Sequence, residues 1–192
     1  MKFRILLLML LTWATALPTQ AFAAQYQIDT PKAHAFIVFR IQHLGYSWIT
    51  GRFNRFEGAF SYDEKDPAAS RVKVEIDTAS VDTNHAERDK HLRSPDFLDV
   101  ARYPKARFVS TAFKERGDGK ATLEGDLTLH GVTRPISIAV EEVGHGPDPW
   151  GGYRRGFEGR TRLALADYGI EYNLGPKSKE LELILSIEGI RQ

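Results

Sequence analysis

Hydrophobic and polar residues alternate along most of the chain from residue 35 onward. In AFIVFRIQH (35–43), Ile37, Phe39 and Ile41 share one face of an extended chain. The other face carries Phe36, Val38, Arg40 and Gln42. A period of two over such lengths is typical of half-buried antiparallel strands. The same period recurs in residues 55–63, 71–77, 121–131, 135–143, 157–165 and 180–190.

Residues that favour turns separate these alternating segments. Gly, Pro and Asp gather at 63–70, 116–120, 130–135 and 144–152, where they can reverse the direction of the chain. We expect about eight or nine strands. Their even spacing predicts an all-β fold, an extended antiparallel β-barrel of about eight strands, with a β-sandwich as the alternative.

An apolar interior is the main functional prediction from this pattern. If the apolar face turns inward, eight strands enclose a space that side chains just fill or that one elongated ligand shares. No Asp, Glu, Lys or Arg interrupts the predicted inward face. Such a lumen can bind hydrocarbon at about 0.8 kcal/mol per buried CH₂, and a solid core without a cavity is the alternative. The predicted inward residues are Ile37, Phe39, Ile41, Phe56, Phe60, Val72, Val74, Ile76, Leu127, Leu129, Ile138, Phe157 and Leu163.

Two glycines lie within strands on the apolar face, at Gly125 and Gly159. Either glycine can mark a bulge or a sharp bend of the barrel wall. Either can also leave room for a molecule inside the barrel. The bend is the favoured interpretation for each glycine taken alone.

The alternation does not by itself show which face of the strands is inside. In an outer-membrane barrel the apolar face contacts lipid and the lumen is polar. Two features favour an inward apolar face. The apolar residues are bulky enough to fill a small lumen, and the chain ends in Ile190, Arg191 and Gln192 without a terminal aromatic residue.

The most charged segment of the chain, TNHAERDKHLRSPDFLD (83–99), predicts a short helix. Thr83 is the expected N-cap of a helix over 84–93. Pro95 should end the helix, because the residue before a proline avoids the helical conformation.

The titratable residues of this helix do not form a recognisable metal or catalytic site. At 100° per residue, His85 and His91 point about 120° apart and cannot bind one ion from one helix. Glu87 and His91 are one turn apart, and surface pairing explains that spacing without a metal. The chain also has no Gly-x-Ser-x-Gly elbow. We therefore expect no metal site and no catalytic residue. If the protein is instead an enzyme, Glu87 and His91 are the candidates for an acid–base pair.

Apolar residues follow the helix, set among charged ones. Phe97, Leu98, Val100 and Tyr103 interrupt the run of polar residues. A helix followed by such a loop predicts a plug or lid at one mouth of the barrel, with Phe97 facing the lumen.

The first residues read as a secretory signal peptide, which we assign to 1–23 with cleavage after Ala23. Lys2 and Arg4 precede an almost entirely apolar run that is shorter than the roughly 20 residues of a spanning helix. An uncleaved anchor is the alternative. Residues 24–192 then form a single domain.

Charge and cysteine content exclude several classes of protein. The chain has 26 basic and 25 acidic residues, and two of the basic ones lie in the signal peptide, which leaves a mature net charge of −1. That balance argues against general nucleic-acid binding. There is no cysteine, so neither disulfides nor thiolate metal sites can form.

Four long segments of the chain resemble the YceI-like family of bacterial, mostly periplasmic, polyisoprenoid-binding proteins. They are HAFIVFRIQHLGYSWITGRFNRFEGAF (34–60), SVDTNHAERDKHLRSPDFLDVARYPKARFVS (80–110), GDLTLHGVTRPI (125–136) and DPWGGYRRGFEG (148–159). The resemblance implies a lipocalin-like barrel extended by short helices, located in the periplasm. It also implies a long isoprenoid chain in the lumen, of the polyisoprenoid, quinone or prenyl-diphosphate kind, and no catalytic residues.

Several residues are candidates for contact with the polar headgroup of such a lipid. His43 ends the inward row and could hydrogen-bond a headgroup at the mouth, or it could be satisfied by backbone at the strand end. Arg88 and Arg93 could pair with a diphosphate, although a solvated helix face is the favoured interpretation. The aromatic residues that could line the mouths, or simply pack, are Tyr46, Trp48, Trp150 and Tyr168.

We therefore expect a periplasmic binding or carrier protein for a long-chain isoprenoid lipid, with no other cofactor and no metal. The alternatives are an enzyme acting on such a lipid and a stress or interaction protein whose barrel is a filled core. We expect no nucleic-acid partner and no membrane-spanning segment after signal cleavage, and a homodimer is compatible with the sequence.

Overall fold

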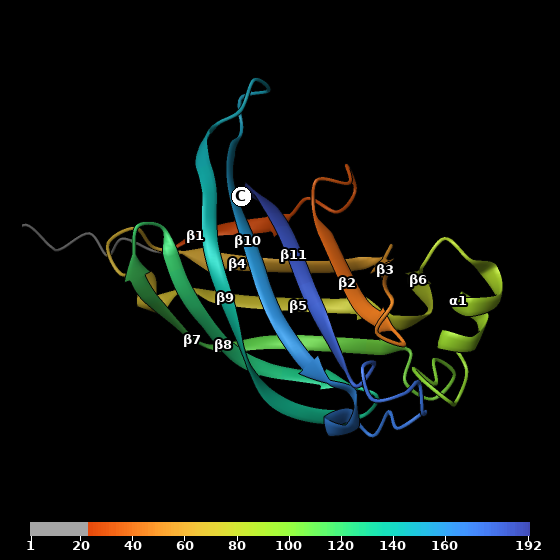
Figure 1. Ribbon diagram of the computed structural model, residues 1–192. Coiled ribbons are helices and arrows are strands. Elements are labelled where there is room, and N and C mark those ends of the chain that lie inside the picture. Colours follow the sequence, from red (N-terminus) through yellow and green to blue (C-terminus); the bar gives the residue numbers. More distant parts are fainter. Residues whose placement is uncertain (1–22) are drawn as a thin grey trace, which may run out of the picture.

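The computed structural model describes residues 23–192, which form long strands and a few short helices (Figure 1). Residues 1–22 of the predicted signal peptide (1–23) lie outside the described residues. The strands are β1 (Ala24–Ile28), β2 (Phe36–His43), β3 (Ser47–Phe53), β4 (Phe56–Tyr62), β5 (Arg71–Asp77), β6 (Val81–Asp82), β7 (Lys105–Gly117), β8 (Lys120–Leu129), β9 (Val132–Pro147), β10 (Tyr153–Ala164) and β11 (Glu180–Arg191). The helical elements are α1 (Ala86–Leu92) and the 3-10 helices η1 (Pro67–Ala69), η2 (Thr78–Ser80) and η3 (Leu165–Tyr168).

Eight of these strands close into an antiparallel barrel. Their order around the ring is β1, β4, β5, β7, β8, β9, β10 and β11. β1 completes the ring by pairing with β11, where Tyr26 lies opposite Arg191. The prediction of an all-β antiparallel barrel of about eight strands is confirmed.

Three further strands extend the wall of the barrel beyond this ring. β11 is longer than β1, and β2 pairs with the remaining part of the same edge, from Leu181 opposite Ile41 to Ser186 opposite Phe36. β3 pairs with β2, and β6 pairs with the end of β3. In Figure 1 these strands and α1 lie on the same side of the barrel.

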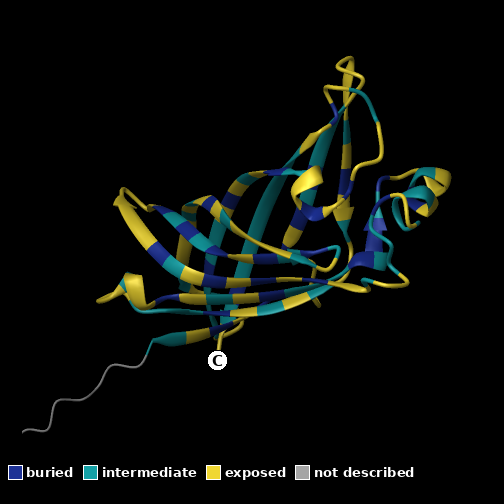
Figure 2. Cartoon of the chain, turned by 90° about the horizontal axis from the view of Figure 1, so that it is seen from below, coloured by how far each residue is buried: buried dark blue, intermediate teal, exposed yellow. Residues whose placement is uncertain are grey.

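The alternation along the strands becomes an inside and an outside. Along β8, Leu123, Leu127 and Leu129 are buried, and the residues between them are more exposed. The first half of β7 shows the same alternation of buried and exposed residues, which Figure 2 displays along the barrel wall. On the outside, Glu182 of β11 pairs with Arg40 of β2 at 2.6 Å and with Arg162 of β10 at 2.8 Å. Apolar rows therefore face inward, and charged rows cross neighbouring strands on the outer surface.

Gly125 lies opposite a β-bulge, which agrees with the prediction that it marks a bulge or bend of the barrel wall. The register between β7 and β8 shifts between Ser110, which lies opposite Gly125, and Ala112. A Cβ at position 125 would lie 2.5 Å from the Phe108 ring and 2.5 Å from the Val109 carbonyl oxygen. The absence of a side chain thus allows β7 and β8 to approach closely where the wall bends.

The helix α1 begins later than its sequence predicts. Its N-cap is His85, whose Nδ1 accepts a hydrogen bond from the Arg88 backbone N–H at 3.2 Å, so the prediction of Thr83 as N-cap was wrong. Thr83 is buried instead, and its backbone N–H and hydroxyl both donate to Asp89 Oδ1, at 2.8 and 2.6 Å. The chain turns at Asn84, which has a φ of 60°, before the helix starts.

Within residues 23–192, no helix is both long enough and apolar enough to cross a membrane.

Candidate functional site

The inside of the barrel is a cavity with a volume of about 230 Å³ and an entirely apolar surface. A packed protein core rarely leaves a void larger than a water molecule, so a solid core does not describe this barrel. Strands from the whole circumference of the barrel contribute to the lining, which we call the lumen. The sequence-predicted residues that line it are Ile37, Phe39, Ile41, Phe60, Val72, Val74, Ile76, Phe97, Leu127, Leu129, Ile138, Phe157 and Leu163.

Two of the predicted residues do not line the lumen. β2 ends at His43, whose carbonyl accepts a hydrogen bond from the Tyr46 backbone N–H at 2.9 Å, and the His43 side chain is exposed at this turn. Phe56 begins β4 and packs against the apolar cluster around Tyr26 and Phe60. Both lie at strand ends, and Phe56 is paired there with Ile76 of β5.

Many lining residues were not singled out from the sequence. Those on β11 belong to an alternating segment that was recognised but not carried into the predicted site. Ile170 and Leu174 lie in the irregular segment before β11, where no periodicity marks them. The additional residues include Ile28, Tyr62, Phe108, Phe113, Leu123, Val140, Ile170, Leu174, Leu181, Leu183, Leu185 and Ile187.

Gly159 differs from Gly125 in its surroundings, because it lines the lumen. The atoms nearest to a Cβ at position 159 would belong to the side chains of Ile138 and Leu185, at 3.1 and 3.3 Å. The missing side chain therefore lets Ile138 and Leu185 pack closely beside the cavity.

A charged residue, Arg155 of β10, is buried at one end of the lumen behind the Tyr62 ring, although it is not among the residues that line the cavity. Only 2% of its side chain is exposed, and its guanidinium lies 4.0 Å from the centre of the Tyr62 ring. It pairs with Glu64 at 2.7 Å and with Glu142 at 3.1 Å. Burial is the largest influence and disfavours its charge, but Glu142, Tyr26 and Tyr62 together outweigh burial, and the pKa of Arg155 is raised.

Polar atoms lie behind the apolar lining at this same end. Ser70 is buried just before β5, and within residues 23–192 neither its Oγ nor Arg155 Nε has a hydrogen-bond partner. Tyr62 covers the Arg155 guanidinium on the lumen side, and burial raises the pKa of its hydroxyl. We call this end, formed by Tyr62, Ser70, Phe113 and Arg155, the Arg155 end.

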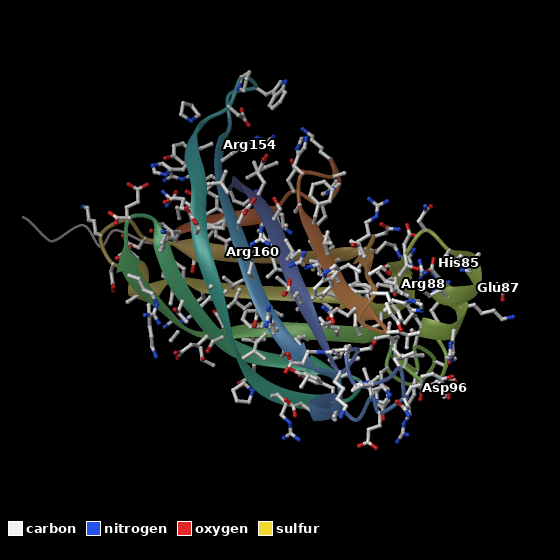
Figure 3. The ribbon with its side chains drawn as sticks, viewed as in Figure 1. His85, Glu87, Arg88, Asp96, Arg154 and Arg160 are labelled. Carbon is white, nitrogen blue, oxygen red and sulfur yellow. The ribbon has the colours of Figure 1, made fainter. Side chains whose placement is uncertain are left out.

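The opposite end of the lumen, which we call the lid end, is covered by α1 and the loop after it. Arg93 holds the segment to the barrel by donating to the Ala79 and Val81 carbonyls at 2.8 and 2.6 Å. Arg88 donates to the hydroxyl and carbonyl of Thr83 at 2.7 and 2.8 Å. Both arginines therefore bind the backbone of this end, and Figure 3 shows Arg88 on the helix beside His85 and Glu87.

Side chains from the lid segment reach the lumen. Leu92, Phe97 and Leu98 line it, and Phe97 is buried. The Phe97 ring packs on His91 and Tyr172, with centroids 4.9 and 5.0 Å apart. The loop after α1 and the loop before β11 therefore meet at the lid end through the Phe97 and Tyr172 rings.

The titratable residues of α1 are arranged as surface pairs. His91 Nε2 lies 2.9 Å from Asp96 Oδ2, rather than being directed toward Glu87. Glu87 is exposed in the first turn of the helix, where a negative charge is favourable. Neither His91 nor Glu87 lines the lumen.

Two carboxylates and a histidine outside the lumen are close enough together to hold a metal ion, but an arginine already lies among them. Single ligand atoms of Asp29, His34 and Glu188 lie within 4.8 Å of one another. Arg154 donates to Asp29 at 2.9 Å, to Asp148 at 2.8 Å, and to Glu188. The Arg154 guanidinium therefore supplies the positive charge that a metal ion would supply. Its ion pairs join the loop after β1 to β10 and β11.

Comparison with known proteins places this architecture among described relatives. The profile of the YceI-like domain matches residues 26–189. A UPF0312 protein of Pseudomonas aeruginosa (strain LESB58) is 61% identical over 173 residues, which cover 90% of each chain.

Two solved structures share the fold at low sequence identity. BcnA of Burkholderia cenocepacia superposes with a TM-score of 0.73 at 19% identity, covering 84% of this chain and 98% of that one. A polyisoprenoid-binding domain from Saccharophagus degradans superposes with a TM-score of 0.64 at 18% identity, covering 90% and 100%.

Proposed function

This chain belongs to the YceI-like family, and from that membership we propose that it binds one long-chain isoprenoid lipid in its lumen. We further propose that it carries this lipid in the bacterial periplasm. The signal-peptide pattern of residues 1–23 supports the location. The name of the related Saccharophagus degradans domain supports the ligand class.

The observation that carries the proposal is the apolar surface of the lumen. Each isoprene unit has five carbons, so its burial contributes roughly 4 kcal/mol before the costs of ordering the chain. A sugar or a nucleotide would lose its hydrogen bonds to water in the same space and gain none. The lumen therefore selects for hydrocarbon.

The polar headgroup is proposed to remain at the lid end. At the Arg155 end, the guanidinium already has two carboxylate partners and is screened from the cavity by Tyr62. At the lid end the cover consists of loops and a short helix that can separate without breaking the strand ladder. Entry of the tail first through the lid end leaves the headgroup in water.

Mass spectrometry of organic extracts of the purified protein tests this function. Protein from cells that make prenyl lipids should carry one such lipid per chain. Leu127→Trp should lose the lipid, because Leu127 is 5% exposed and faces the lumen. Asp126→Trp is the matched control, since Asp126 is exposed on the outer face of the same strand.

Two results would overturn the proposal. One is an extract without lipid from protein whose fold is intact by circular dichroism. The other is equal lipid content in the Leu127→Trp and wild-type proteins.

A further inference from the structure

Two aromatic rings lie across the lumen at the Arg155 end. Phe113 and Tyr62 both line the cavity, and their rings meet edge to face with centroids 6.1 Å apart. β7 starts at the lid end, where the Pro104 carbonyl accepts a hydrogen bond from the Thr78 backbone N–H at 3.1 Å, and Phe113 lies toward the far end of this strand. β4 ends at Tyr62, and the 3-10 helix η1 in the turn after it lies beside β7. We call Tyr62 and Phe113 the floor of the lumen.

A β-bulge turns Phe113 inward. The buried residues in the first half of β7 are Ala106, Phe108 and Ser110, which are spaced by two. The register with β8 then shifts between Ser110 and Ala112, and the next buried residue is Phe113. A bulge changes the direction in which the following side chains point. It therefore places the Phe113 ring at the end of the lumen, where an unbroken alternation would have placed the Ala112 methyl group.

The Tyr62 ring is supported from behind by a buried ion-pair network. The Arg155 guanidinium lies 4.0 Å from the centre of this ring. Arg155 is held in turn by Glu64, in the turn after β4, and by Glu142 of β9. A ligand that pushed Tyr62 outward would disturb a buried, paired charge, which is costly. This end of the lumen is therefore a fixed stop, whereas loops and a short helix cover the lid end.

We propose that the floor limits the length of the isoprenoid tail that the lumen accepts, so that Phe113 and Tyr62 are specificity-determining residues. The inference rests on the proposed function, in which the tail enters first through the lid end. Each isoprene unit between the lid end and the floor gains hydrophobic free energy by leaving water. A unit beyond this limiting length stays in water at the lid end and gains none. Affinity should therefore rise with each added unit up to the limiting length and then stop rising.

Two substitutions should move the limiting length in opposite directions. Phenylalanine has six more carbon atoms than alanine, and an isoprene unit has five, so Phe113→Ala should lengthen the accepted tail by about one unit. Val140 lines the lumen on β9, two residues before Glu142 on the same row. Val140→Phe adds four carbon atoms at this end and should shorten the accepted tail by about one unit. A loss of stability alone would not shift the limit both ways.

Competition among prenols of different lengths tests the inference. Protein freed of its lipid is incubated in mild detergent with an equimolar mixture of all-trans prenols that differ by one isoprene unit each. The protein is then isolated again and extracted, and mass spectrometry measures how much of each prenol it retained. For the wild-type protein we expect retention to rise with length and to become constant above the limiting length.

Phe108→Ala is the matched control. It removes the same six carbon atoms from the same strand, and Phe108 lines the side wall of the lumen, where its ring lies over Gly125. Because this position lies between the lid end and the floor, the substitution should weaken the binding of every tail that passes it. It should leave the limiting length unchanged. Circular dichroism checks that each variant is folded.

The outcomes separate this inference from the proposed function. If wild-type retention keeps rising without a limit, or if Phe113→Ala and Phe108→Ala shift the limit equally, the floor does not set the length, although lipid binding stands. An unchanged limit in folded Phe113→Ala has the same meaning. If Phe113→Ala does not fold, Val140→Phe decides, because a shorter limit supports the inference and an unchanged one contradicts it. A wild-type protein that retains no prenol contradicts the proposed function itself and the inference with it.

Discussion

Arg155 is a buried charged side chain beside the apolar cavity, and only 2% of its side chain is exposed. It continues the inward row of β10 two residues before Phe157, and it carries a charge into an otherwise apolar interior. Removing a charge from water is costly unless it is paired. Glu142, Glu64 and the face of Tyr62 compensate this charge, and Nε is left without a hydrogen-bond partner within residues 23–192.

Replacing Arg155 by Met should lower the free energy of unfolding by about 3 kcal/mol, because Glu142 would be left partly buried without its partner. Arg160→Met is the matched control, on the same strand but with a side chain that is 62% exposed. It should change stability by less than about 0.5 kcal/mol. Urea unfolding of the two variants measures the difference, and equal effects would contradict the role given to Arg155.

Asp29 should make the stability of the protein sensitive to acid. Burial opposes its ionisation, but hydrogen bonds from Arg154 and His34 outweigh burial and hold the pKa of this carboxyl below its usual value of 3.8. A lowered folded-state pKa gives stability that is present above the unfolded value and is lost as pH falls through the folded value. The contribution of Asp29 should therefore disappear as the pH decreases below about 3.8.

Unfolding free energies measured against pH test this expectation. Asp29→Asn should be less stable than wild type at neutral pH, and the two curves should converge in acid. Asp118→Asn, in the exposed β7–β8 turn, should run parallel to wild type. Parallel curves for Asp29→Asn would show that the Asp29 carboxylate does not govern acid sensitivity.

At the scale of elements, the wall of the barrel is shaped by where strands approach and where they change partners. β11 pairs with β2 along one part of its edge and with β1 along the next. The bulge of β7 opposite Gly125 bends the wall on the other side. These features set the curvature of the sheet, which alternation alone does not encode.

Gly125→Ala should destabilise the protein by about 1–3 kcal/mol, because the new methyl group would overlap a ring and a backbone carbonyl. The overlap with the Val109 oxygen, at 2.5 Å, cannot be relieved by a side-chain rotation. Gly144→Ala is the control, since no atom lies within 4 Å of a Cβ there. Thermal melts compare the two, and a Gly125→Ala protein as stable as Gly144→Ala would show that the bulge tolerates a side chain.

At the scale of the whole molecule, the lumen links lipid binding to stability. A ligand that binds only the folded state raises its stability by RT ln(1 + [L]/Kd). Removing the proposed lipid should therefore lower the melting temperature, and adding a prenyl lipid in mild detergent should restore it. Leu127→Trp should melt at the same temperature with and without added lipid, whereas Asp126→Trp should respond as wild type does.

The alternating pattern by itself determined the strands and the inward direction of most lumen residues. Phe39 and Leu127, for example, follow from a period of two, because successive side chains of a strand point to opposite faces. The segment over 84–93 was recognised as helical, but its N-cap was misplaced, because Thr83 and His85 can both accept a hydrogen bond and only the Asp89 contact decides between them.

Tertiary structure alone decided that the interior is hollow, that Arg155 is buried beside it, and that Ile170 and Leu174 reach the lumen from an irregular loop. Whether an apolar face packs solid or encloses a cavity depends on the tilt and register of strands around the ring. Those quantities arise from contacts between residues far apart in the chain, such as Tyr26 with Arg191, and a local pattern of polar and apolar positions does not contain them.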